Sequence, residues 1–282
     1  MRLSVRHVTE YRYDGPGRSL VQVLRLAPGP HEGQRVRHWR VAADHGQALQ
    51  PFTDGYGNLS HLLTLHRPHQ GLRITVEGEV ETDDTAGVVR GAAETLPPAF
   101  FLRTTAQTAP DDALRALAAD AAREAGGTLA RLHALMGLVH GRVAYRLGMT
   151  GAATTAAEAL AGGSGVCQDH AHVMLAAARL MGVPARYVGG YLWPGVDGRE
   201  ETASHAWAEA WVEGLGWVGF DAANGLCPTD RYVRAAVGLD YGDAAPVRGV
   251  RHGAGRETLT VAVRVDDAVQ GRSRPDAAGQ QQ

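Results

Sequence analysis

The stretch GGSGVCQDHAH at residues 162–172, followed by ASHAW at 203–207 and WVGFD at 217–221, decides the fold expected here. The first segment is typical of a glycine-rich loop that opens an alanine-rich helix, which we expect to end near Gly182 and Pro184. The other two segments read as neighbouring strands. A helix packed against a hairpin indicates an α+β core.

Cys167 lies where the glycine-rich loop meets the helix. Unpaired N–H groups and the positive end of the helix dipole collect in the first turn of a helix, and this environment favours the thiolate over the thiol. A free cysteine is also often an inert buried residue, and Cys167 taken alone favours that interpretation.

His205 and Asp221 favour chemistry over packing. A thiolate nucleophile needs a base that returns a proton to the leaving group, and that base needs an acceptor on its other ring nitrogen. Side chains alternate faces along a strand, so His205 and Asp221 share a face only if an odd number of residues joins the two strands. We therefore expect an odd-length connection, such as the three residues 213–215, or a bulge with the same effect.

Three further residues are weaker candidates for the cleft. Gln168 follows the cysteine and could donate to an oxyanion, although the backbone N–H of Cys167 is better placed for that purpose. Tyr145 is a second possible donor. Trp207 shares the face of His205 and could wall a dry cleft, or equally could be ordinary core.

Metal binding is the competing interpretation of the same segment. Cys167, His170 and His172 resemble a ligand cluster, but on a helix positions 167 and 170 share a face while 172 projects elsewhere. The chain has no HExxH or CxxC pattern. We expect no metal and no cofactor.

The remainder of the chain suggests three parts. Residues 1–105 alternate with period two in at least five segments and predict an antiparallel β-sandwich. Residues 106–240 hold helices near 110, 128–140 and 155–161 and the segments described above. Residues 241–282 add one alternating strand at 257–265 and a polar end whose last dozen residues we expect to be disordered.

Composition excludes several functions. The 282 residues include no lysine, and Schiff-base, pyridoxal-phosphate and P-loop chemistry all require that amine. The 28 basic residues are all arginine and face 30 acidic ones, so a net charge of −2 predicts no nucleic-acid partner. Two cysteines make no disulfide framework, and no secretory signal or membrane-length apolar run is visible. We expect a cytoplasmic protein that binds no membrane; its oligomeric state stays open.

The motifs resemble one known family. GVCQD followed by HAH, then LMGVPARYVGGYL, SHAWAEAW and GWVGFD are similar to the transglutaminase-like superfamily. Within it the chain resembles the branch of bacterial transglutaminase-like cysteine proteases that have an N-terminal β domain. His170, where an aromatic residue is usual, and the Asp221-Ala-Ala-Asn turn, where Asp-Pro-Thr is usual, are departures from the pattern.

The resemblance implies a papain-like core, with a central helix on an antiparallel sheet, joined to the N-terminal sandwich. It also implies that Cys167 is the nucleophile, His205 the general acid/base and Asp221 the orienting carboxylate of a thioester-forming enzyme. Hydrolysis of a peptide or protein amide is the favoured outcome. Glutamine acyl transfer to an amine and a non-catalytic binding module are the alternatives.

Overall fold

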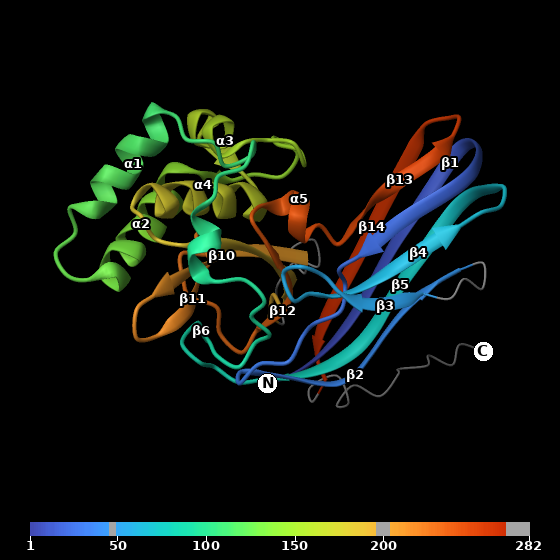
Figure 1. The fold of residues 1–282 in the computed structure, drawn as a ribbon, viewed down its shortest axis with the longest axis horizontal. Helices are drawn as coiled ribbons and strands as arrows, with labels where there is room; N and C mark the ends of the chain where they lie inside the picture. The colour runs from blue at the N-terminus through green and yellow to red at the C-terminus, as the bar shows by residue number, and fades with distance from the viewer. Residues whose placement is uncertain (45–48, 196–203, 269–282) are drawn as a thin grey trace, which may run out of the picture.

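The computed structural model describes residues 1–44, 49–195 and 204–268. The residues predicted to be disordered at the C-terminus lie outside the described part. Within it the chain forms two parts, a β-sandwich and a mixed core (Figure 1). No described helix is long and apolar enough to span a membrane.

The predicted α+β fold class is confirmed. The strands of the sandwich sheet are β1 (Arg2–Leu24), β2 (Gln34–Ala43), β3 (Gln50–Thr53), β4 (Leu59–Leu65), β5 (His69–Thr82), β13 (Val247–Gly253) and β14 (Glu257–Asp267). The core contains β6 (Val88–Val89), η1 (Pro98–Leu102), α1 (Asp112–Ala122), α2 (Thr128–Arg142), β7 (Ala144–Tyr145), α3 (Ala156–Gly162), β8 (Ser164–Gly165), α4 (Cys167–Leu180), β9 (Ala185–Leu192), β10 (Ser204–Val212), β11 (Gly216–Phe220), β12 (Tyr232–Gly238) and α5 (Tyr241–Ala244).

The sandwich is one antiparallel sheet folded over on itself. β1 bends back at its middle (blue in Figure 1), so its first half pairs with β5 and β14 and its second half with β4 and β13. Tyr11 and Ile74 from one layer and Leu20 and Leu63 from the other share a single buried cluster. Within the predicted segment 241–282, β13 and β14 therefore return to the N-terminal strands, whereas α5 stays with the core.

The core is built around α4, which lies on a five-stranded sheet of order β12-β9-β10-β11-β6. Ala206, Ala208 and Ala210 of β10 pack against the alanine-rich helix in the main buried cluster. Small side chains allow this close approach of helix and sheet, and α1, α2 and α3 cover the rest of α4 (Figure 1).

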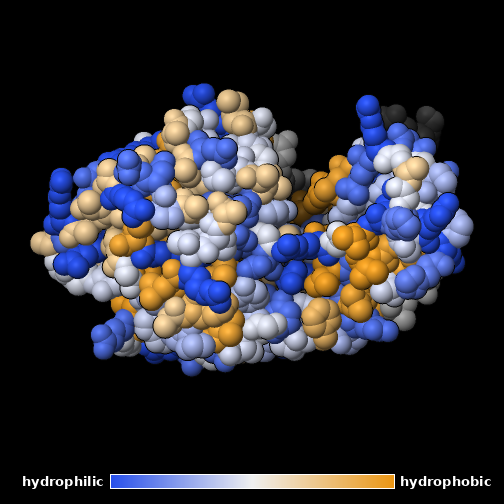
Figure 2. All heavy atoms as spheres, turned by 45° about the horizontal axis from the view of Figure 1, so that its top comes forward, coloured by the Kyte–Doolittle hydropathy of each residue, from blue (hydrophilic) through white to orange (hydrophobic). Residues whose placement is uncertain are grey.

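The sandwich packs against the outer part of the core sheet. Leu3, Val5 and Val80 of the sandwich form a buried cluster with Tyr191 of β9 and Val233 of β12. Figure 2 shows the surface hollowed between the two parts, with hydrophobic side chains in the hollow.

Candidate active site

The cysteine reaches the site through a short, tightly built loop. Gly163 ends α3 with a φ of 62°, which favours glycine, and a Cβ on Gly165 would lie 2.6 Å from Asp169. Asp169 accepts hydrogen bonds from the N–H of Val166 (2.7 Å) and the hydroxyl of Thr150 (2.6 Å). These contacts hold the loop in place, so α4 begins with Cys167 at its first position.

The hairpin has the odd connection expected from the sequence. Trp211 pairs with Trp217 and Ala208 with Phe220, which leaves residues 213–215 between β10 and β11. In the same register Asp221 lies opposite Trp207, two residues from His205 and on the same face. The Nε2 of His205 is 2.6 Å from the Oδ2 of Asp221.

Asp221 is completely buried yet richly hydrogen-bonded. Its Oδ2 accepts from Tyr232 (2.7 Å) and from the Asn224 side chain (2.7 Å) as well as from His205. Its Oδ1 accepts the N–H groups of Ala223 (3.0 Å) and Asn224 (3.2 Å). Burial alone would raise the pKa of Asp221, but His205, Tyr232 and Asn224 together lower it, so the carboxylate stays ionised.

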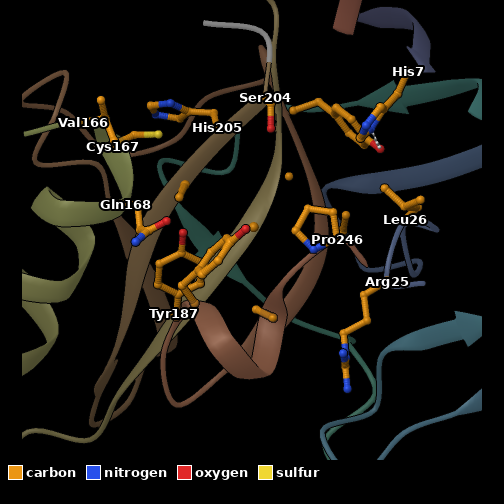
Figure 3. Close-up of a pocket in the computed structure, with 17 residues that line it drawn as sticks. His7, Arg25, Leu26, Val166, Cys167, Gln168, Tyr187, Ser204, His205 and Pro246 are labelled. Carbon is orange, nitrogen blue, oxygen red and sulfur yellow. Dashed lines mark hydrogen bonds between the residues drawn. The ribbon is translucent and has the colours of Figure 1, made fainter. Parts of the chain in front are cut away.

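The Asp221 carboxylate acts in turn on the imidazole. Burial by itself lowers the pKa of His205, but the hydrogen bond and charge of Asp221, followed by Cys167, raise it above its ordinary value. With Nε2 committed to Asp221, Nδ1 is the ring nitrogen left for the thiol. Figure 3 shows the sulfur of Cys167 directed toward the His205 ring.

Cys167 and His205 line one cavity of about 170 Å³, called here the thiol pocket. Its far wall comes from the sandwich, through His7 and Leu26 (Figure 3). Burial lowers the pKa of His7 to about 4, so its ring is neutral. His7 bonds the Tyr191 hydroxyl at 3.2 Å and the Thr9 hydroxyl at 2.9 Å, which ties the sandwich to β9.

A second cavity of about 520 Å³ shares His205 with the thiol pocket and is called here the Trp193 pocket. Its walls are mostly apolar or aromatic and do not include Cys167. They consist of Tyr145, Leu192, Trp193, Pro194, His205, Ala223, Asn224, Leu226, Thr229, Arg231 and Tyr232.

The three weaker candidates lie in three different places. Gln168 lines the thiol pocket, with its side-chain nitrogen 3.5 Å from the Ala152 carbonyl. Tyr145 is 40% exposed and lines the Trp193 pocket. Trp207 is buried behind the site, with its ring centre 6.3 Å from that of His205 and 5.4 Å from that of Tyr232.

The two histidines of α4 are engaged elsewhere. His170 directs its ring nitrogens at the carbonyl oxygens of Val166 (2.9 Å) and Val143 (2.7 Å). The Nε2 of His172 accepts the N–H of Tyr241 at 3.0 Å. Among the described residues no group of three or more His, Cys, Asp or Glu side chains could hold a metal ion.

Comparison with known proteins agrees with this architecture. The family described as "Bacterial transglutaminase-like N-terminal region" matches residues 3–81, and the "Transglutaminase-like superfamily" matches residues 115–222. The uncharacterized protein ML0607 of Mycobacterium leprae is 31% identical over 94% of this chain and 98% of its own. This chain belongs to the transglutaminase-like superfamily.

Two further relatives extend the comparison. The uncharacterized protein Rv2569c of Mycobacterium tuberculosis is 32% identical, over 88% of this chain and 87% of its own. The crystal structure of a "Putative Cysteine Protease" from Cytophaga hutchinsonii has the same fold, with a TM-score of 0.75 and 22% identity. The structural alignment covers 94% of this chain and 90% of the Cytophaga hutchinsonii protein.

Sequence reasoning missed two residues of this transglutaminase-like site, Asn224 and Tyr232. Asn224 stands in the turn after Asp221, at the point where the chain departs from the usual motif. Tyr232 begins β12, a strand that was not predicted because, apart from Arg234, both of its faces are apolar or small and alternation is therefore weak. The sequence Tyr-Val-Arg-Ala-Ala-Val at 232–237 was the feature that could have indicated this strand.

Proposed function

We propose that this protein is a thiol enzyme that cleaves amide bonds of peptides or proteins through a Cys167–His205–Asp221 triad and a thioester intermediate. The observation that carries the proposal is the joint position of the three groups. Cys167 and His205 line one pocket, and Asp221 holds the ring from behind at 2.6 Å. An activated nucleophile, a base and a carboxylate that orients the base are the groups that this kind of acyl transfer requires.

The reaction runs in two halves. The thiolate of Cys167 attacks the carbonyl carbon; a C–S bond forms, the C–N bond breaks, and the His205 imidazolium gives its proton to the departing amine. Neutral His205 then takes a proton from water, whose oxygen attacks the thioester. The C–S bond breaks, the acid is released, and the thiolate–imidazolium pair is restored.

The tetrahedral intermediates require donors for an oxyanion. The backbone N–H groups of Cys167 and Gln168 lie in the first turn of α4, where no helical partner exists for them. The side-chain amide of Gln168 lies next to them on the pocket wall, 3.5 Å from its carbonyl acceptor, and is a second donor within reach. Tyr145 borders the Trp193 pocket instead, which makes it a weaker candidate.

Water and an amine compete for the thioester, and we favour water. The chain has no lysine of its own that could serve as an amine. Incubation with glutamine peptides and a fluorescent alkylamine, followed by mass spectrometry, measures the partition. We expect hydrolysed peptide to exceed dye-labelled peptide; efficient dye transfer that outcompetes hydrolysis would assign the protein to acyl transfer.

Cysteine labelling separates an enzyme from a binding module on the same scaffold. Cys167 shares the thiol pocket with His205, the base of the proposed triad, whereas burial raises the pKa of Cys227 and keeps that thiol protonated. At pH 6 we expect iodoacetamide to modify Cys167 at least about tenfold faster than Cys227. Peptide mapping reports both rates in one sample, and equal slow labelling would favour the binding module.

A further inference from the structure

His205 borders both the thiol pocket and the Trp193 pocket, and the two sides of a scissile amide bond would occupy different pockets. Of these two pockets Cys167 lines the thiol pocket and not the Trp193 pocket, so the carbonyl carbon that it attacks enters the thiol pocket. His205 lines both pockets, and it is the group that delivers a proton to the departing nitrogen. The amine side of the bond therefore extends past His205 into the Trp193 pocket. This division depends on the proposed function.

The Trp193 pocket combines apolar walls with the guanidinium of Arg231. Leu192, Pro194 and Leu226 offer apolar surface, and the guanidinium of Arg231 lies over the Trp193 ring with its carbon 5.1 Å from the ring centre. Arg231 donates from Nε to the Trp193 carbonyl at 3.2 Å. No ion pair joins Arg231 to a carboxylate among the described residues, and its guanidinium borders the pocket with one terminal nitrogen close to Gly195.

The strand register sets the distance between chemistry and cation. His205 pairs with Gly190, and Trp193 follows three residues later, where its N–H donates to the Arg231 carbonyl at 2.9 Å. An extended chain advances roughly 3.3 Å per residue, so Trp193 and Arg231 lie about 10 Å along the sheet from His205. Two or three residues of extended peptide span that length.

We infer that Arg231 recognises the terminal carboxylate of the leaving peptide, so that the enzyme cleaves two or three residues before a free C-terminus and prefers an apolar residue there. A planar guanidinium held by an aromatic ring and a carbonyl matches a carboxylate in shape and charge. The walls of Leu192, Pro194 and Leu226 fit an apolar side chain beside it.

A pair of peptide libraries tests this specificity. Randomised octapeptides with a free C-terminal carboxylate, and the same peptides ending in a carboxamide, are digested and the products identified by mass spectrometry. We expect the free acids to be cleaved about tenfold faster in kcat/KM, with di- and tripeptides released. Equal rates for acid and amide, with Cys167-dependent cleavage in both, would overturn the inference and leave the proposed function standing.

Substitutions of Arg231 distinguish recognition of the carboxylate from a purely structural role of this side chain. Arg231→Gln should reduce the acid-to-amide ratio to about one, Arg231→Lys should keep part of it, and Arg231→Glu should reverse it. Arg103→Gln is the matched control, because Arg103 also lies 5.1 Å from the centre of a ring, that of Phe100, but borders neither pocket. A ratio that survives in Arg231→Gln would show that Arg231 only braces Trp193.

Binding provides a readout that does not depend on turnover. Calorimetric titration of the Cys167→Ala variant compares the dipeptide alanyl-leucine with its carboxamide. We expect the free acid to bind about tenfold more tightly, and we expect Arg231→Gln in the same background to remove the difference. Equal binding of acid and amide, or no binding of either, would overturn the assignment even if neither library were cleaved.

Discussion

Replacing Cys167 with alanine is expected to abolish turnover while the fold remains. Without the sulfur no thioester forms, and the loss in kcat should be at least about 10⁴-fold, since catalysis by a triad collapses when its nucleophile is removed. Cys167 is only half-buried at the edge of the main cluster, so the loss of stability should be about 1 kcal/mol or less. Steady-state kinetics and thermal unfolding measure the two effects.

Cys227→Ala provides the matched control for this change. Cys227 is the other half-buried thiol and also packs against the main cluster, but it does not line the thiol pocket. Its replacement should leave kcat within about twofold, since a substitution away from reacting groups has small effects. Near-normal turnover in Cys167→Ala, or equal losses in the two variants, would refute the assignment of Cys167 as the nucleophile.

Cys167→Ser adds information about the base. A serine hydroxyl is far less acidic than a thiol, so a site arranged around a thiolate–imidazolium pair does not activate it. We expect the serine variant to be nearly as inactive as the alanine variant. Mass spectrometry of the native enzyme with a slow peptide ester should detect an acyl adduct on Cys167, and no adduct should form on Cys227.

The geometry of the pair His205–Asp221 could be predicted because it depends on local rules. Side-chain alternation and the three-residue connection at 213–215 are both readable from a short stretch of chain. The helix start at Cys167 was predictable for the same reason, from a glycine-rich loop followed by an alanine-rich run. Local sequence patterns are therefore sufficient to predict where the three proposed catalytic groups lie in the fold.

The pocket walls depended on contacts between distant parts of the chain. His7 meets Tyr191, 184 residues away in sequence, because β1 packs against the core sheet. Nothing in the alternation of the first strand indicates which face meets the core or which residue borders the thiol. Arg231 and Trp193 are brought together by the pairing of β12 with β9, and β12 was not among the predicted strands.

Replacing Asp221 with asparagine is expected to produce the second large loss, about 10³- to 10⁴-fold in kcat. Asparagine keeps the size of the side chain but carries an NH₂ group. At Oδ2 that group would meet three donors, and at Oδ1 it would meet two backbone N–H groups. Either orientation breaks hydrogen bonds in a fully buried place, which should also cost about 1–3 kcal/mol of stability.

The protonation of His205 distinguishes this mechanism from simple loss of structure. Asp221 raises the pKa of His205 against the effect of burial, so in the native enzyme the imidazolium persists above the usual pH range. In Asp221→Asn only Cys167 still opposes the effect of burial, so the pKa of His205 falls. NMR titration of the His205 ring should show this downward shift. Labelling of Cys167 by iodoacetamide at pH 6 should slow toward the rate of Cys227.

Tyr232→Phe gives a graded comparison for the same network. It removes one donor from Oδ2 and leaves the carboxylate, its charge and the aromatic contact with His205 in place. We expect a loss of about tenfold in kcat/KM and only a small upward shift in the pKa of Asp221, because His205, Asn224 and the backbone still stabilise the ionised form. If Asp221→Asn lost no more activity than Tyr232→Phe, and both kept the native titration of His205, then Asp221 would only maintain packing and the triad would reduce to a Cys167–His205 dyad.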